Sequence, residues 1–482
     1  MEPRGGIINN ESEALPTASV TGRLEQVLTA AQRAEAVMAS SSRLARAHAL
    51  RAIASDLREH RDELVRLADE ETSLGSGRLD GELERTAFQL DLFAEVLEAG
   101  EIHGRVIDHA DPEWPPAPRP DLRRRLVPIG IVAMFSASNF PFAFSVVGGD
   151  TASALAAGCP VVVKAHSGHP RLSQRVAALA QHALARAGLP EGTLSLVEGR
   201  DLGRRLVLDD RVDAVAFTGS TTGGRALFDL ASGRPRPIPF FGELGSVNPV
   251  FVTQRAAERE GERIWEELAA SFTLGAGQFC TKPGIVFVPR SAGAPATIAS
   301  HLASGQTWTM LDDRIASGFA NRMRQMRARA DVDTILDGIT SSLVSSVTLL
   351  RTRIEDFLAD PAGLGEESFG PTTLLVEYDE EAQLVTAARQ FVGELTGTLQ
   401  ALPDDVIVPS LVAELEPRVG RLIWNQWPTG VSVTGAMQHG GPYPSSTSAR
   451  DTSVGTAAMD RFLRPVTYQN FPAELLPSEL RD

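Results

Sequence analysis

Short, continuous apolar runs alternate with helical stretches through most of this chain from residue 126 onward. The first runs lie at residues 129–135, 161–163, 194–197, 214–217 and 250–252, with a helical stretch at 171–187. Strands buried on both faces of a parallel sheet have this pattern, whereas strands with one solvated face alternate apolar and polar residues. The pattern predicts an α/β fold whose ligands bind at the carboxyl ends of the strands.

A second alternation predicts another parallel sheet, with runs at residues 284–288, 372–376 and 422–424. A chain of 482 residues is too long for one ordinary core, so we expect two or three structural domains. Residues 20–97 have helical periodicity, residues 111–120 contain five prolines, and residues 462–471 are strand-like. A basic, polar helical stretch at 319–330 is assigned only a solvated face.

Charge balance and cysteine count limit the function classes. A formal net charge of −15 disfavours wholesale binding to nucleic acid or to an anionic membrane surface. Two cysteines, Cys159 and Cys280, do not make a disulfide framework and suit a reducing compartment. The first ten residues lack the apolar core of a signal peptide, and no stretch has the length of a membrane span. We expect a cytoplasmic enzyme without nucleic-acid or membrane partners.

The glycine-rich run Leu274-Gly-Ala-Gly-Gln-Phe-Cys280 carries the strongest chemical signal. Glycines let the backbone approach a ligand closely, and a thiolate is the nucleophile that attacks a carbonyl carbon. Glu243, in Phe241-Gly-Glu-Leu-Gly245, is available upstream as a base for hydrolysis. Cys159 lies next to an apolar run, and we interpret it as an inert core thiol.

Other motifs are ambiguous when taken singly. Asn139 follows a predicted strand, where its amide would donate to an oxyanion or simply form a turn. Lys164 ends an apolar strand, a position that suits a ribose or phosphate and equally a lysine reaching for solvent. Gly219 and Ser220 separate a strand from a helix, where N–H groups meet a pyrophosphate, although the segment does not fit the usual dinucleotide fingerprint.

The remaining candidates are an acidic turn and three histidines. Glu367 and Phe369 would bind a ribose and flank a nicotinamide, or belong to a solvated acidic loop. His166 and His169 are spaced like metal ligands, but no cysteine or carboxylate cluster accompanies them, so we predict no metal site. His439 would tune the thiol, hold a substrate carboxylate, or be satisfied by the backbone.

In order and spacing, these motifs together resemble the aldehyde dehydrogenase superfamily from about residue 20 to residue 471. Several stretches are similar to those of α-ketoglutaric semialdehyde (2,5-dioxovalerate) dehydrogenases. They include Ser138-Asn-Phe-Pro-Phe-Ala-Phe-Ser145, Gly148-Gly-Asp-Thr-Ala-Ser153, Trp427-Pro-Thr-Gly-Val431, Gln438-His-Gly-Gly-Pro-Tyr-Pro444 and Arg464-Pro-Val-Thr-Tyr-Gln-Asn-Phe471. A fatty-aldehyde-oxidising, NADP-linked branch shares some of them, including the histidine motif.

The resemblance implies two doubly wound parallel-sheet domains and a small β oligomerisation arm. The NAD(P)-binding domain would comprise residues 1–110 and 128–245, and the catalytic domain residues 246–457. Residues 111–127 and 458–482 would form the arm, which pairs with a neighbouring subunit in a homodimer or homotetramer.

The resemblance also implies the mechanism. Cys280 would attack the aldehyde, Asn139 would hold the oxyanion, and Glu243 would activate the water that hydrolyses a thioester. NADP or NAD would accept the hydride. The residues expected to bind this cofactor are Lys164, Ser167, Arg200, Gly219, Ser220, Gly245, Glu367 and Phe369. Gln278, His439 and Arg421 are candidates for contacting the substrate.

One departure from the family pattern concerns cofactor choice. Many members have a glutamate three residues after the strand-end lysine, where this chain has Ser167. That glutamate would repel a 2′-phosphate, whereas a serine donates to it, so NADP is suspected to be preferred. Arg200 is a candidate partner for the phosphate.

Three alternatives to 2,5-dioxovalerate oxidation stay open. One is a long-chain or aromatic aldehyde as substrate, with NADP preference. Another is a coenzyme A-dependent acylating enzyme, which the presence of Glu243 disfavours. The remote one is a non-catalytic scaffold of the same fold, disfavoured because both Cys280 and Glu243 are present.

Overall fold

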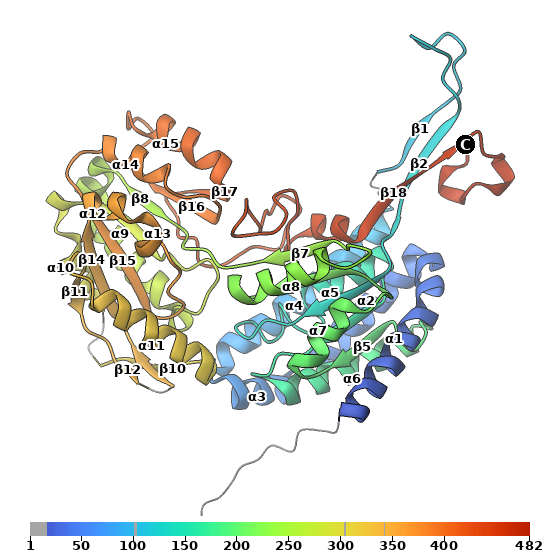
Figure 1. The fold of residues 1–482 in the computed structure, drawn as a ribbon, viewed down its shortest axis with the longest axis horizontal. Helices are drawn as coiled ribbons and strands as arrows, with labels where there is room; N and C mark the ends of the chain where they lie inside the picture. The colour runs from blue at the N-terminus through green and yellow to red at the C-terminus, as the bar shows by residue number, and fades with distance from the viewer. Residues whose placement is uncertain (1–16, 101–103, 303–304, 342) are drawn as a thin grey trace, which may run out of the picture.

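The computed structural model describes residues 17–100, 104–302, 305–341 and 343–482. The first 16 residues of the expected NAD(P)-binding domain therefore lie outside the described residues. Figure 1 shows two lobes, each built around its own sheet, and an antiparallel arm that projects away from them. The predicted α/β class with two parallel-sheet domains is confirmed.

Four helices open the described chain: α1 (Thr17–Ser40), α2 (Arg43–Glu59), α3 (Arg61–Thr72) and α4 (Ser76–Ala99). Ser42 starts α2, because its hydroxyl accepts from the N–H of Ala45 and satisfies a free helix donor. Leu50, Ile53 and Leu57 recur at helical spacing on one face of α2 and are all buried. This periodicity was the signal for helix in residues 20–97.

The first lobe contains a five-stranded sheet that is parallel throughout. Its order is β5 (Leu194–Val197), β4 (Val161–Lys164), β3 (Ile131–Phe135), β6 (Val212–Thr218) and β7 (Phe240–Glu243). Val132 and Met134 of β3 face one core, and Ile131 and Ala133 face the other. Helices therefore cover both faces, which explains why the strands have unbroken apolar runs.

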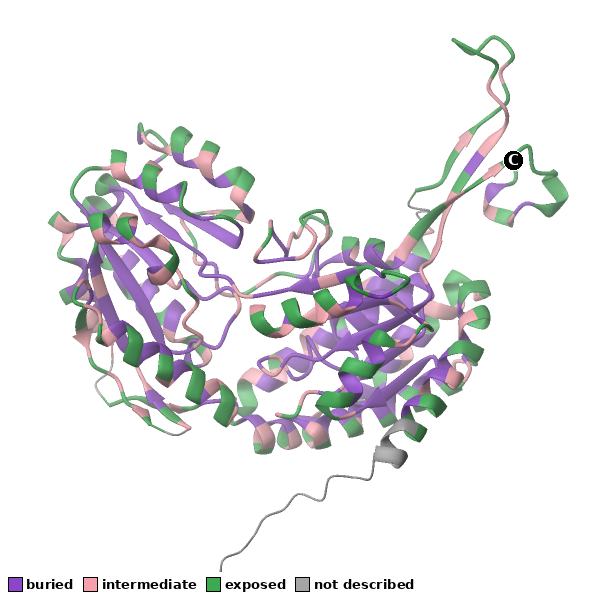
Figure 2. Cartoon of the chain, in the orientation of Figure 1, coloured by how far each residue is buried: buried purple, intermediate pink, exposed green. Residues whose placement is uncertain are grey.

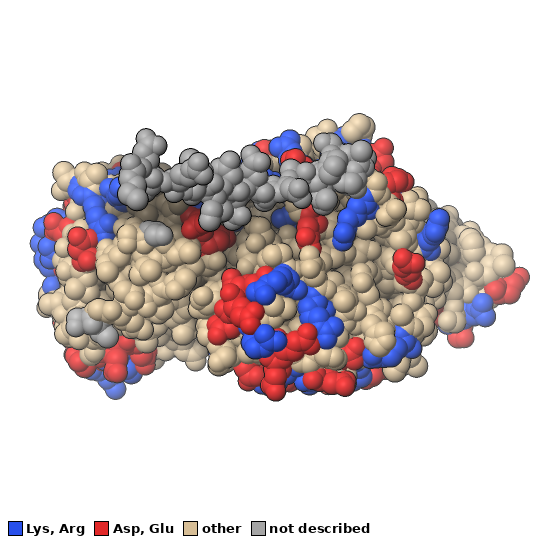
Figure 3. All heavy atoms as spheres, turned by 90° about the horizontal axis from the view of Figure 1, so that it is seen from below, with Lys and Arg blue, Asp and Glu red and all other residues tan. Residues whose placement is uncertain are grey.

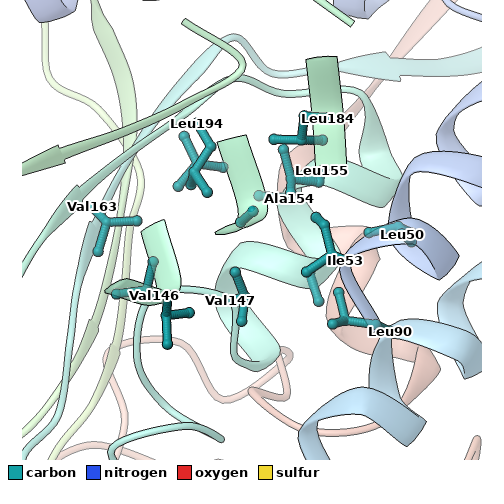
Figure 4. Packing of buried hydrophobic residues seen from close by; sticks show 14 of the residues in the cluster. Leu50, Ile53, Leu90, Val146, Val147, Ala154, Leu155, Val163, Leu184 and Leu194 are labelled. Carbon is teal, nitrogen blue, oxygen red and sulfur yellow. The ribbon is translucent and has the colours of Figure 1, made fainter. Parts of the chain in front are cut away.

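Helices α2, α4, α5 (Gly149–Ala157) and α6 (Pro170–Arg186) cover one face of this sheet, and α1, α7 (Arg200–Leu208) and α8 (Thr221–Ser232) cover the other. Figure 4 shows how side chains from separate elements meet in the larger core, among them Leu50, Ile53, Leu90, Leu155, Val163, Leu184 and Leu194. The core fixes the strand ends at which the candidate residues lie.

The second lobe contains a seven-stranded sheet, parallel except at its edge strand β11 (Asp333–Leu336). From β11 the order continues through β14 (Thr348–Arg353), β15 (Thr372–Tyr378), β9 (Ile285–Pro289), β8 (Val250–Val252), β16 (Glu394–Gln400) and β17 (Val419–Trp424). Helix α9 (Gln254–Thr273) packs on one face and α11 (Asp313–Arg327) on the other. The shorter helices of this lobe are α10 (Ala294–His301), α12 (Ile354–Ala359), α13 (Pro361–Leu364), α14 (Ala382–Ala388) and α15 (Val408–Leu415).

The assignment of a purely solvated face to the helix near residues 319–330 was wrong. Phe319, Met323 and Met326 recur at helical spacing on α11 and are buried in the core of the second lobe. Arg322 is also buried and donates to the carbonyl of Gly363. A high content of basic residues thus hid an amphipathic pattern.

Three antiparallel strands form the arm: β1 (Val106–Asp108), β2 (Leu122–Pro128) and β18 (Leu463–Gln469). β2 lies in the middle, so β18 has one edge without a partner strand among the described residues. A separate small sheet joins β10 (Thr307–Thr309), β13 (Val344–Ser346) and β12 (Thr340–Ser341) in the second lobe.

Burial follows the layers. In Figure 2 the strands of both large sheets are mostly buried, and the outer faces of the helices are exposed. Acidic and basic side chains are interspersed on the face drawn in Figure 3. Within the described parts of the chain, every helix is too short or too polar to cross a bilayer.

Candidate active site

Glu243 lies where the two lobes meet. It ends β7 at the carboxyl edge of the first sheet and pairs with Thr218 of β6 on one side. On the other side it forms an isolated bridge to Ser446, in the segment that returns from the second lobe. The base expected from sequence is therefore held by backbone contacts from both directions, and its side chain is buried.

The loop that carries Cys280 has an unusual backbone. Gly275, Ala276 and Gly277 all have positive φ, a conformation that favours glycine. A Cβ on Gly277 would come within 2.1 Å of the carbonyl oxygen of Gly370, so only glycine fits there. Asn248, itself at φ 51, donates from its side-chain amide to the carbonyls of Cys280 (2.8 Å) and Lys282 (3.0 Å). These contacts fix the position of the thiol.

His439 lies between the two expected catalytic groups. Its Nε2 is 3.5 Å from Cys280 Sγ and 3.0 Å from Glu243 Oε1. The other oxygen of Glu243 accepts a hydrogen bond from the Ser453 hydroxyl. The backbone N–H of His439 donates to Thr452 Oγ1 at 2.9 Å, which anchors the imidazole. Thiol, imidazole and carboxylate therefore form one cluster, the Cys–His–Glu cluster, in which Glu243 and His439 are buried and Cys280 is partly exposed.

Electrostatics within this cluster set the resting protonation states. Burial raises the pKa of the Cys280 thiol well above its usual value, and the negative charges of Glu243 and Glu367 raise it further. Burial would also raise the pKa of Glu243, but its interactions with His439 and the hydrogen bond from Ser453 bring it below its ordinary value. The resting site thus pairs a neutral thiol with an ionised carboxylate, and the nucleophile requires a base.

Asn139 lies beside the cysteine loop. Its side-chain Nδ2 donates to the carbonyl of Gln278 at 3.1 Å, and an amide nitrogen carries a second N–H that remains for a ligand. Arg78 of α4 donates to the carbonyl of Asn139 at 2.5 Å and packs against Phe140 and Phe279, with Cζ 5.2 and 4.8 Å from their ring centroids. The oxyanion candidate is thus tied to the loop of the nucleophile.

Gln278, a candidate for contacting substrate, is fully buried. Its side-chain oxygen accepts from the N–H of Leu311 at 3.0 Å, and its amide nitrogen is 3.4 Å from the carbonyl of Gly275. These contacts within the protein favour a role in holding the cysteine loop.

A group of cations lies at the end of β4. Lys164 is partly buried, which lowers its pKa, and the positive charges of Arg314 and Arg200 lower it further. Arg200 begins α7 in the first lobe, whereas Arg314 comes from α11 in the second lobe. Ser167 is exposed beyond the same strand end. The sequence had indicated Lys164, Ser167 and Arg200, but not the contribution of Arg314 from the opposite lobe.

The N-terminus of α8 lies between this cation group and the Cys–His–Glu cluster. Ser220 caps the helix by accepting from the N–H of Gly223 at 3.3 Å, and Gly219 N–H donates to the carbonyl of Glu243 at 3.1 Å. Gly245 N–H donates to Thr221 Oγ1 at 3.1 Å. The loop before α8 is therefore bonded directly to the strand that holds Glu243.

Glu367 approaches the same place from the second lobe. A Cβ on Gly245 would come within 2.5 Å of Glu367 Oε2, so the glycine makes room for this carboxylate. Burial raises the pKa of Glu367 to about 7, although the nearby Lys282 ammonium opposes the shift. Lys282 is buried, donates to the carbonyl of Thr372 at 2.7 Å, and burial lowers its pKa to about 8. Phe369 follows, partly exposed.

These residues fit a dinucleotide lying between the lobes. Along the strand ends lie cations at β4, then a helix N-terminus and, beside the thiol, a carboxylate next to a glycine. Lys164, Arg200 and Arg314 would face a phosphorylated ribose, and Ser220 and Thr221 a pyrophosphate. Glu367 would face the second ribose.

The two histidines considered as metal ligands have other partners. His169 contacts Ser173 Oγ and the carbonyl of Ala137, and His166 accepts from Gly168 N–H. Burial lowers the pKa of His166 to about 3, as do the neighbouring charges. In the described residues, the three side chains arranged closely enough to share a metal ion are those of the Cys–His–Glu cluster.

Comparison with known proteins agrees with this arrangement. The family model described as "Aldehyde dehydrogenase family" matches residues 13–337. The chain belongs to the aldehyde dehydrogenase family. Two relatives of this dehydrogenase are called α-ketoglutaric semialdehyde dehydrogenase. The one from Acinetobacter baylyi is 40% identical over 95% of this chain and 88% of its own length, and the one from Azospirillum brasilense is 43% identical over 91% and 85%.

Solved structures show the same fold at lower identity. The structure of 3,6-anhydro-L-galactose dehydrogenase in complex with NAP superposes with a TM-score of 0.78 at 21% identity, covering 93% of this chain and 91% of that one. Apo betaine aldehyde dehydrogenase from Staphylococcus aureus superposes with a TM-score of 0.79 at 19% identity, covering 94% and 89%. Aldehyde dehydrogenases thus share this two-lobed architecture.

Proposed function

We propose that this dehydrogenase oxidises 2,5-dioxovalerate to 2-oxoglutarate with NAD(P), using Cys280, Glu243 and Asn139 as its catalytic residues. The observation that carries the chemistry is the Cys–His–Glu cluster, in which thiol, imidazole and carboxylate lie within 4.8 Å of one another. The names of the relatives at 40% and 43% identity support this substrate.

The first step is removal of the thiol proton. Because its pKa is raised, Cys280 needs a base, and His439 Nε2 at 3.5 Å is in place to accept the proton. The negative charge of Glu243, 3.0 Å from that nitrogen, stabilises the imidazolium that forms, while the same charge opposes the thiolate. The thiolate then attacks the aldehyde carbon and gives a thiohemiacetal.

Asn139 acts on the oxygen of that intermediate. Its free N–H and the backbone N–H of Cys280 are the donors for the oxyanion, since Nδ2 is held at the cysteine loop by the carbonyl of Gln278. NAD(P), when bound, would supply the acceptor for the hydride that leaves the carbon attached to sulfur. Cys280 is left as a thioester.

Glu243 serves the hydrolytic half-reaction. Its Oε1 contacts His439 at 3.0 Å but has no well-aligned hydrogen-bond donor, so this oxygen is available to a water. Its lowered pKa keeps it ionised at neutral pH, as a general base must be. Attack of water on the thioester releases the acid and restores the thiol. Because Glu243 is in place to activate that water, hydrolysis is favoured over transfer to coenzyme A.

NADP as the preferred cofactor is supported by the charges at the end of β4. Lys164, Arg200 and Arg314 place positive charge there, and Ser167 stands where a carboxylate would repel a 2′-phosphate. Ser167→Glu is expected to reduce kcat/KM with NADP by about tenfold and to spare NAD, since one repulsive contact costs about 1.4 kcal/mol. Equal use of both cofactors before and after the substitution would remove this part of the proposal.

Assembly into a homo-oligomer through the arm is supported by its free strand edge. The outer edge of β18 has unpaired backbone groups among the described residues, and a neighbouring subunit would cover them. Cross-linking and sedimentation velocity test this, and a monomer at micromolar concentration would overturn it. A cytoplasmic location stays a prediction from cysteine use.

Initial-rate kinetics with a panel of aldehydes tests the substrate. With each cofactor in turn, 2,5-dioxovalerate is expected to give the highest kcat/KM, ahead of 5-oxopentanoate, pentanal, decanal and benzaldehyde. If decanal or benzaldehyde leads, the long-chain or aromatic alternative replaces the substrate proposed here. The use of Cys280 and Glu243 is tested separately below.

A further inference from the structure

Two arginines near the catalytic cysteine lack an acidic partner. Arg85 lies on α4 and Arg421 on β17, and both are partly buried. Within the described parts of the chain, neither guanidinium has a carboxylate oxygen within 4.0 Å, although most arginines of this protein have one. Arg85 Nη1 and Arg421 Nε are fully buried without a hydrogen-bond acceptor. An unpaired buried cation is costly, so such a group calls for an anion.

Contacts place Arg85 beside the Cys–His–Glu cluster. Its Cζ is 5.7 Å from the ring centroid of Phe144, whose ring is 6.2 Å from that of His439. Its Nη2 is 3.4 Å from the carbonyl of Val431. Burial lowers the pKa of Arg85, and the negative charges of Glu82, Cys280 and Glu243 oppose that shift.

Arg421 approaches the same place from the second lobe. It donates to the carbonyls of Pro428 (2.8 Å) and Gly430 (3.2 Å). Gly430 directly precedes Val431, whose carbonyl Arg85 contacts. Burial lowers its pKa, and a negative charge on Cys280 opposes the shift. Arg421 therefore shapes the loop at residues 428–431 and adds positive charge near the thiol.

The surroundings of Arg85 are otherwise apolar. Phe140, Phe144, Val431 and Met437 belong to one small hydrophobic cluster between the lobes. Glu82, three residues before Arg85 on α4, uses its Oε1 to accept from the N–H groups of Phe142 and Ala143. Burial raises the pKa of Glu82, so its charge offsets that of Arg85 only in part. A guanidinium with an unused donor thus lies near the Cys–His–Glu cluster in largely apolar surroundings.

We propose that Arg85 binds the distal carboxylate of the substrate, while Arg421 holds the loop at residues 428–431 in position for it. This rests on the proposed function, because 2,5-dioxovalerate carries a carboxylate about 5 Å from its aldehyde carbon by ordinary bond lengths. The aldehyde would bind to Cys280 as the carboxylate meets Arg85. Selection of anionic semialdehydes over neutral aldehydes then follows from a charge-assisted hydrogen bond.

The test compares an anionic aldehyde with a neutral one of the same chain length. Arg85→Met is expected to reduce kcat/KM for 2,5-dioxovalerate by about 10- to 100-fold, mostly through KM, because charged hydrogen bonds have this strength. With pentanal, the change is expected to stay within about threefold, because nothing at the far end needs the cation. Arg85→Lys, which keeps the charge, is expected to lose less, and glutarate is expected to inhibit wild type competitively but not Arg85→Met.

Arg46→Met is the matched control. Arg46 is also a partly buried arginine without an ion pair in the described residues, but it lies near Cys159 and donates to the carbonyl of Ser41. The Arg46→Met variant is expected to leave the ratio of kcat/KM for 2,5-dioxovalerate to that for pentanal unchanged. An equal effect of Arg85→Met on both aldehydes, or none on either, overturns the inference. If wild type itself prefers pentanal, the proposed substrate fails first, which distinguishes the two failures.

Discussion

The two cysteines of this chain both have a raised pKa, but one is fully buried, the other is partly exposed, and their chemistry is opposite. Cys159 follows α5 in the core of the first lobe, and its sulfur lies 3.5 Å from the carbonyl of Phe462. Burial raises its pKa to about 11. Burial also raises the pKa of Cys280, yet its sulfur lies 3.5 Å from His439 Nε2 and close to Glu243. A raised pKa alone therefore does not distinguish a structural thiol from a nucleophile.

The difference lies in what each fold region brings to the sulfur. Around Cys159 there are apolar side chains and backbone groups, and the charges that act on it are those of Arg46 and Asp213. Around Cys280 a strand end of the first lobe and a loop returning from the second lobe supply a carboxylate and an imidazole. A thiol with a raised pKa becomes useful when a base adjoins it and an aldehyde can reach it.

Removing each sulfur is the strongest way to break this comparison. Cys280→Ala is expected to lower kcat by at least about 10⁴-fold, since no other group forms the covalent intermediate. Cys159→Ala is expected to keep kcat within about twofold and to cost about 1 kcal/mol of unfolding free energy, because the sulfur acts as a small buried hydrophobe. Steady-state kinetics and urea unfolding measure the two effects. Comparable activity losses in both variants would refute the distinction.

Replacing the imidazole tests the base. His439→Gln keeps a polar group of similar size but removes the proton acceptor, so kcat/KM is expected to fall by about 100-fold near pH 7. Because the thiol remains titratable, raising the pH should recover part of this loss. A uniform loss at every pH would mean that His439 is structural.

Removing the charge of Glu243 is expected to have a smaller effect, a shift in the pKa of the Cys280 thiol in a definite direction. That carboxylate raises the pKa of Cys280, so Glu243→Gln should move the midpoint of iodoacetamide alkylation to lower pH. Sign matters here: removing a negative neighbour makes the thiolate easier to form. Alkylation of Cys159, followed on the same peptides, should stay unchanged. A midpoint that stays constant or rises contradicts the electrostatic argument.

Much of the fold was predictable from sequence because its strands are buried on both faces. The runs at residues 194–197 and 250–252 coincide with β5 and β8. The helix at α11 was assigned the wrong environment because its arginines outnumber the buried Phe319, Met323 and Met326. Local composition is a weaker guide than periodicity.

The site was predictable where a motif is local and not where the fold creates it. Cys280 lies in a run of glycines that has few structural uses, so its role could be inferred. His439 is 159 residues away from Cys280 in sequence, and its contact with the sulfur depends on the path of the returning loop. Arg85 is one of several charged residues on α4, and its lack of an ion pair depends on tertiary packing.

The most direct measurement traps the acyl enzyme. Glu243→Gln is mixed with 2,5-dioxovalerate and NADP, quenched in acid, digested and examined by mass spectrometry. Loss of the hydrolytic base should leave a thioester on the peptide containing Cys280, with about one NADPH formed per subunit and Cys159 unmodified. If NADPH forms while the Cys280 peptide stays unmodified, the covalent role of this cysteine is contradicted.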